Sequence, residues 1–247
     1  MKLQARLFFA LCIVFMACKK EKQEQGTLLI TFNNVVNGAS LSLNTSSYTN
    51  SAGEAFTVST FKYYISNITL TRLDNSQLQL PDGYYLVDES KPASKTIRIP
   101  APKGEYRGFS FLVGVDSTRN VSGAQTDALD PVHGMFWSWN SGYIMARMEG
   151  TSPASGAAGQ ALTFHIGGFK GPYNAVRRVT LVSPISLTVN AERKPEVTVK
   201  ADLYTWFSNP FQVKFQQTST IHVPGKDAWR ISENYSNMFR ITDVTDL

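Results

Sequence analysis

The sequence predicts an all-β protein: a single antiparallel β-sandwich with long loops and a short C-terminal helix. Two observations support this class. Short apolar runs, several with period-two alternation, recur along the chain, and turn sequences such as PDG, PKGEY and GFKGPYN separate them. Helical periodicity is scarce and is clearest in one segment near the C-terminus.

The first 17 residues have the pattern of a secretory signal. Lys2 and Arg6 form a basic start, and an apolar run of roughly ten residues follows, too short to cross a bilayer as a helix. Cys18 comes directly after Ala17, as at the cleavage site of a bacterial lipoprotein. We therefore expect a signal peptide over 1–17, a lipid on Cys18 and a flexible polar tether over 18–26. A plain signal peptide with an incidental cysteine is the alternative.

The remaining residues, 27–247, are predicted to form one domain. Cys12 would be lost with the signal, so the mature domain has no cysteine for a disulfide or a thiolate metal site. Without Lys2 and Arg6, 22 basic residues face 19 acidic ones, and no basic run exists beyond the tether. This balance argues against a nucleic-acid partner.

The expected elements follow in chain order. Residues 196–203 show the strand pattern most clearly, because Val197, Val199 and Ala201 alternate with Thr198 and Lys200. A helix is expected over 227–239, with Asp227 as its cap. The expected strands lie within 27–32, 61–73, 96–102, 107–116, 134–150, 161–168, 176–190, 195–207 and 238–244.

The stretch HGMFWSWNSGYIMARMEG, residues 133–150, carries two of the four tryptophans. As a strand it would place Trp137, Trp139 and Met145 on one face, which favours a core strand filled with aromatic side chains. The strand 161–168 would pair with it as a hairpin. There His165 lies opposite Leu162, Phe164 and Ile166, a position more typical of a structural histidine than of a ligand.

The order of these motifs resembles the MbnP-like family. The shared features are GVD with RN shortly after, then DP and GMFWSWNSGYI, then FHIGG, and finally ENYSNMF near the end. The block Trp-x-Trp-Asn-Ser-Gly-Tyr is the most specific of them. The namesakes of the family are methanobactin-associated periplasmic copper proteins, and many members are bacterial lipoproteins.

The resemblance implies a β-sandwich that binds copper(I) through two histidines and a kynurenine, which a partner di-haem oxidase makes from a tryptophan. Copper(I) prefers soft or imidazole ligands, whereas an intact indole offers only an N–H donor. Carried over to this sequence, the histidine is His165 and the modifiable residue is Trp137 or Trp139.

One expected ligand is missing. Copper-binding members have a histidine directly after the asparagine that corresponds to Asn120, and Val121 stands here. His133 and the thioether of Met145 are the candidate substitutes, with a surface turn and core packing as their alternatives. His222 is expected to be an exposed residue at a loop entry.

The function predicted from these observations is a copper-binding protein of the cell envelope, anchored to the outer membrane by lipid on Cys18. No catalytic motif stands out, so we expect no enzymatic activity. The alternative is a lipoprotein that binds no metal and serves as a binding or scaffold module for carbohydrate or a protein partner.

Overall fold

The computed structural model describes residues 24–137 and 142–246, so the predicted signal peptide, Cys18 and Trp139 lie outside the described part. It confirms the all-β sandwich, with two sheets and a short C-terminal helix. The smaller sheet has the strand order β14-β12-β1-β2, with β7 also paired to β1. The larger has the order β11-β8-β4-β9-β10-β13, and β3, β5 and β6 also pair with β4.

The strands of the smaller sheet are β1 (Gln25–Val36), β2 (Ala39–Ser40), β7 (Thr96–Pro102), β12 (Pro195–Asp202) and β14 (Phe239–Asp246). Those of the larger sheet are β3 (Ser47–Thr49), β4 (Ala55–Arg72), β5 (Gln77–Gln79), β6 (Tyr84–Asp88), β8 (Gly104–Val113), β9 (Ile144–Thr151), β10 (Ala161–Gly167), β11 (Arg177–Val189) and β13 (Thr220–Ile221). The α-helices are α1 (Ser117–Val121) and α2 (Lys226–Tyr235). The 3-10 turns are η1 (Pro92–Lys95), η2 (Asp127–Leu129), η3 (Pro131–His133), η4 (Ala158–Gln160) and η5 (Leu203–Phe207).

Two strand pairs depart from the antiparallel prediction. β12 runs parallel to β1, and the two-residue β13 runs parallel to β10. A parallel neighbour must arrive by a crossover connection, so neither pair can be recognised from an adjacent hairpin in the sequence. The other ladders in the two sheets are antiparallel.

The core lies between the sheets and is rich in aromatic rings. Phe32 of β1 packs edge-on against Tyr63 of β4, with ring centroids 5.9 Å apart, and against Phe111 of β8, at 6.1 Å. Phe239 of β14 contacts the same two rings, at 5.7 and 5.2 Å. These contacts join the two sheets, because each crosses from one to the other.

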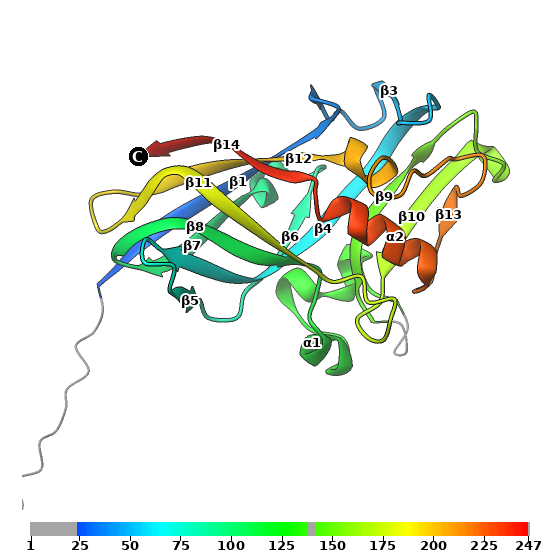
Figure 1. The fold of residues 1–247 in the computed structure, drawn as a ribbon. Coiled ribbons are helices and arrows are strands. Elements are labelled where there is room, and N and C mark those ends of the chain that lie inside the picture. Colours follow the sequence, from blue (N-terminus) through cyan, green and yellow to red (C-terminus); the bar gives the residue numbers. More distant parts are fainter. Residues whose placement is uncertain (1–23, 138–141, 247) are drawn as a thin grey trace, which may run out of the picture.

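The helix α2 confirms the C-terminal helix prediction, although its cap is Gly225 and Asp227 lies in its first turn. Tyr235 packs against Trp206 of η5 and donates a hydrogen bond to the carbonyl of Ala175. Figure 1 shows α2 with β9, β10 and β13 at one end of the elongated molecule. Within the described residues, no helix is long and apolar enough to cross a membrane.

Candidate functional site

The predicted hairpin exists and consists of β9 and β10. His165 stands opposite Arg147 in this ladder, and Arg147 is in turn opposite Lys62 of β4. The side chains of Leu162, Phe164 and Ile166 are buried in the core, whereas His165 is only partly buried. The period-two pattern therefore assigned His165 correctly to the outer face of the sheet.

Glu149 fixes the orientation of the His165 ring. Its Oε1 atom lies 2.8 Å from Nε2 of His165 and 2.7 Å from Nη2 of Arg147. A carboxylate only accepts hydrogen bonds, so Nε2 carries the proton and Nδ1 of the neutral ring keeps a free lone pair. A histidine whose second nitrogen donates to a carboxylate is the usual arrangement of a metal ligand.

The charge states of this pair follow from their surroundings. Burial of the imidazole lowers the pKa of His165, while the hydrogen bond to Glu149 acts to raise it and is outweighed. Burial would raise the pKa of Glu149, but the hydrogen bonds from His165 and Arg147 outweigh it and hold the pKa below its usual range. His165 is therefore neutral at pH 7, which is the form that can coordinate a metal.

A second imidazole lies beside the first. In the parallel β10–β13 pair Phe164 stands opposite Ile221, so the following residues, His165 and His222, come together. Their ring centroids are 5.3 Å apart, at an interplanar angle of 79°. Two imidazoles bound to one metal at about 2.0–2.1 Å have centroids roughly 5 to 6 Å apart, so this spacing is compatible with a shared ion.

Trp137 lies against β10 at Gly167. A Cβ atom added to Gly167 would come 2.5 Å from Cζ3 of Trp137, so the indole covers that glycine. The β9–β10 ladder shifts register between Ile166 and Gly167, so the indole is placed by its contact with Gly167 and not by the alternation of faces along β10. Glycine at 167 is required because any side chain there would displace the indole.

The sequence predicted that the Trp-containing stretch forms one strand, and the structure corrects this prediction. β9 begins at Ile144, and Phe136 forms an isolated antiparallel bridge with Tyr143. The backbone N–H of Trp137 donates to the carbonyl of Gly142, at 2.9 Å. Gly142 has a φ of +69°, a conformation that favours glycine and turns the chain into β9. We call the described residues 135–137 and 142–144 the tryptophan hairpin.

Asn120 holds the tryptophan hairpin in place. Its side chain is buried, donates from Nδ2 to the carbonyls of Val115 and Asp116, and accepts from the backbone N–H of Tyr143 at 2.8 Å. Its Oδ1 atom also leaves no room for a side chain at Gly142. Thus Asn120 contacts Gly142 and Tyr143, although these residues belong to separate motifs of the sequence.

The other candidate ligands are engaged elsewhere. Met145 is fully buried, and its sulfur accepts from the backbone N–H of Val115 at 3.1 Å. The Nε2 atom of His133 lies 2.9 Å from the carbonyl oxygen of Asp127. Val121 ends α1 and is 73% exposed. Trp139 lies outside the described residues.

The site therefore consists of His165 and His222, with Glu149 and Arg147 behind the first imidazole, and Trp137 lies over Gly167 of the same strand. The described residues contain no group of three or more His, Cys, Asp or Glu side chains that could hold a metal. Zinc and calcium need more ligands than this, whereas copper(I) accepts few, with imidazole among those it prefers.

Sequence reasoning placed His165 on the outer face of the sheet and His222 at an exposed position, and the structure confirms both. The run Ser-Thr-Ile-His-Val-Pro-Gly does alternate, since Ile221 is buried and His222 is not. That alternation indicates that His222 faces away from the core. It does not indicate the strand beside which His222 lies, because a two-residue parallel strand carries no pairing signal.

A comparison with protein-family models agrees with the resemblance seen in the sequence motifs. A model of the MbnP family matches residues 25–223 of the chain. No curated protein sequence gave a significant match. Among solved structures, MbnP from Methylosinus trichosporium is similar, with 18% sequence identity, a TM-score of 0.48, and coverage of 83% of this chain and 82% of that one.

Proposed function

The chain belongs to the MbnP family, and from this premise we propose that it binds copper(I) through Nδ1 of His165 and the imidazole of His222. The observation that supports the proposal most strongly is the closeness of the imidazoles of His165 and His222. One ring is oriented by Glu149 at 2.8 Å, and the second ring lies 5.3 Å away. Two imidazoles supply nitrogen donors of a type that copper(I) accepts.

His222 takes the place of the ligand that Val121 does not provide. Of the histidines other than His165, His133 is hydrogen-bonded to Asp127, whereas His222 adjoins the His165 ring. The proposed site therefore keeps two histidines, but the second comes from the residue directly after β13 rather than from α1.

A tryptophan-derived third ligand is the finer part of the proposal. Trp137 lies over Gly167, two residues after His165, and Trp139 is the alternative. Dioxygen, or an equivalent oxidant used by a partner di-haem oxidase, would cleave the indole C2–C3 bond. Hydrolysis would then release C2 as formate and leave a kynurenine with a free aromatic amine, a nitrogen donor that indole lacks. The net gain is about four mass units.

The location proposed is the cell envelope, with the domain attached to the outer membrane by a lipid on Cys18. The support is the signal-like start of the sequence and the polar tether after it. In this arrangement the protein holds or passes on copper and catalyses no reaction of its own.

The test uses protein purified from its native host grown with ample copper. We expect about one copper per chain, bound as copper(I), and an intact mass that reports both the lipid on Cys18 and any oxidised tryptophan. His165→Ala and His222→Ala should each reduce the affinity for copper(I) at least tenfold, measured by competition with a chelator.

His133→Ala is the matched control, because its ring is hydrogen-bonded to the backbone carbonyl of Asp127. It should leave copper binding unchanged. Wild-type protein without copper would contradict the proposal. Copper that is lost in His133→Ala and retained in His222→Ala would place the second ligand at His133.

A further inference from the structure

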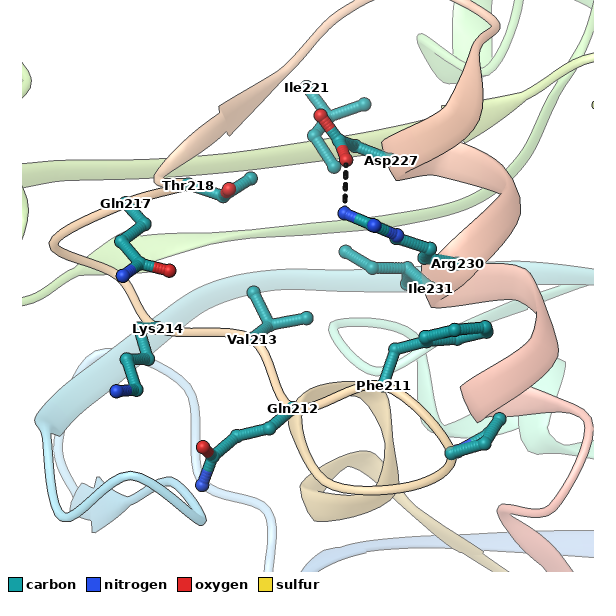
Figure 2. A pocket seen from close by; sticks show the side chains of 11 residues that line it. Phe211, Gln212, Val213, Lys214, Gln217, Thr218, Ile221, Asp227, Arg230 and Ile231 are labelled. Atoms are coloured by element: carbon teal, nitrogen blue, oxygen red, sulfur yellow. Dashed lines mark hydrogen bonds and ion pairs between the residues drawn. The ribbon is translucent and has the colours of Figure 1, made fainter.

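A second feature at the same end of the molecule is a pocket of about 290 Å³, beside α2. Figure 2 shows its walls, which come from the loop 210–218, from Ile221 of β13 and from the first turns of α2. Val213 and Ile231 contribute apolar surface, and the polar groups of Gln217, Thr218 and Arg230 surround it. The volume is near the lower limit of typical ligand pockets and suits a molecule of about one sugar ring.

The loop that forms the pocket is held rigidly by buried or partly buried polar side chains. Asn234, which is fully buried, accepts from the backbone N–H of Phe211 at 2.8 Å and donates to its carbonyl at 2.6 Å. Glu54 accepts from the backbone N–H of Phe215 at 2.6 Å and from that of Gln216 at 3.2 Å. A loop fixed at both ends in this way is preformed, so a ligand would not have to order it.

Arg230 is the main charged group of the pocket. Figure 2 shows its guanidinium extending from α2 toward the loop that carries Gln217 and Thr218. It lies 5.7 Å from the centre of the Phe211 ring, and its Nη1 atom lies 3.3 Å from Oδ1 of Asp227. That ion pair is half exposed, so it contributes little to stability and leaves most of the guanidinium donors available.

The charge and the polar groups of the lining define the ligand. Arg230 and Lys214 are positive and Asp227 is negative, so the lining carries a net charge of one positive unit. The carboxamides of Gln212 and Gln217 and the hydroxyl of Thr218 can bond hydroxyl groups. The planar guanidinium matches a carboxylate, and the apolar surface matches the C–H face of a sugar ring.

We propose that this pocket binds a small hydroxylated carboxylate of the size and chemistry of one hexuronic acid. The carboxylate bonds to Arg230, and the ring packs against Val213 and Ile231. The hydroxyl groups bond to Gln217 and Thr218. This site is separate from the copper site, although Ile221 in its wall directly precedes His222.

The test is a ligand-observed NMR titration of the purified full-length protein with glucuronate, glucose and propionate. We expect glucuronate to bind with a Kd of about 1 mM, and more weakly as salt is added. Glucose lacks the carboxylate and propionate lacks the hydroxyls, so each should bind at least tenfold more weakly.

Two variants and one control locate the site. Arg230→Gln should weaken glucuronate binding at least tenfold, and Gln217→Ala about threefold, since it removes one hydrogen-bonding group from the rim. Arg98→Gln changes an exposed arginine on β7 of the other sheet and should have no effect. His165→Ala should also leave glucuronate binding intact, which separates this proposal from the copper proposal.

Glucuronate binding that neither Arg230→Gln nor Gln217→Ala changes would overturn the proposal, as would the absence of saturable binding. Equal binding of propionate would also overturn it, because the pocket would then be a simple anion site. A melting temperature close to that of the wild type should accompany each variant, since Arg230 is partly exposed.

Discussion

The two sides of β9 and β10 use similar chemical groups in opposite ways. On the core side, Met145 is fully buried and its sulfur accepts a backbone hydrogen bond. On the outer side, His165 donates through one nitrogen to Glu149 and keeps the other free beside His222. Met145 and His165 are both potential copper(I) ligands by residue type, but only His165 lies beside a second potential ligand, His222.

This contrast shows that residue type alone does not identify a metal ligand. A soft sulfur that packs in the core contributes to stability, and moving it to bind a metal would open a cavity. An imidazole on a partly exposed face can bind a metal without such a cost. Substitutions on the core face should therefore change the stability of the protein, and substitutions on the outer face should change its metal binding.

The largest expected effect is on the core side. Met145→Ala should lower the free energy of unfolding by about 2–5 kcal/mol, because it removes a buried side chain and leaves a cavity. Copper binding by the variant that remains folded should match the wild type. The measurement is urea denaturation together with chelator competition, and Val132→Ala at an exposed position is the control. A loss of copper without a loss of stability would mean that Met145 is a copper ligand rather than a core residue.

The next effect is on the outer side. Glu149→Gln should reduce the affinity for copper(I) about 10- to 100-fold, because the neutral amide holds the His165 tautomer less firmly. Stability should change far less than in Met145→Ala. Chelator competition measures the affinity, and the ¹⁵N shifts of the His165 ring report the tautomer. Glu105→Gln, an exposed glutamate on β8, is the control. An unchanged tautomer would show that Glu149 does not position the ring.

A smaller effect concerns the loop that supports the tryptophan hairpin. Burial would raise the pKa of Asp116, but hydrogen bonds from Tyr84, the Arg119 backbone and Asn67 outweigh it and hold the pKa below its ordinary value of 3.8. The contribution of Asp116 to stability is therefore complete above pH 3.8 and is lost as the pH falls through the lower folded-state pKa.

The corresponding measurement compares the urea midpoints of wild type and Asp116→Asn between about pH 6 and pH 3. The wild type should be the more stable at the upper end, and the difference should shrink below pH 3.8. A difference that stays constant across this range would mean that the carboxylate contributes nothing through its charge.

The smallest effect on stability is expected for Val121→His. The free energy of unfolding should change by no more than about 0.5 kcal/mol, because the position is exposed. Affinity for copper(I) should rise about tenfold, since the new imidazole follows Asn120, which holds the tryptophan hairpin. Val132→His at another exposed position should not raise it. No gain at position 121 would show that copper lies nearer to β13 than to α1.

Local patterns in the sequence predicted much of the fold. Alternation placed Leu162, Phe164 and Ile166 inside and His165 outside, and periodicity near Ile231 predicted α2. Both signals arise within one element and need no knowledge of distant residues. The sandwich class followed from the same short-range patterns.

Long-range contacts account for what the sequence did not reveal. The position of Tyr143 in the tryptophan hairpin depends on the side chain of Asn120, which lies more than twenty residues upstream. The position of His222 depends on a parallel pair between β10 and the two residues of β13. Neither contact has a periodic signature, so the hairpin was interpreted as a strand and His222 as an isolated loop residue.

The short parallel pair of β10 and β13 also determines that folding must precede the binding of a metal by both histidines. His165 and His222 lie more than fifty residues apart in the chain, and they become neighbours only when β13 docks beside β10. An unfolded chain would offer separate imidazoles with no common position for an ion. A metal held by both rings would therefore be acquired after folding, and its presence would mark the chains that have finished folding.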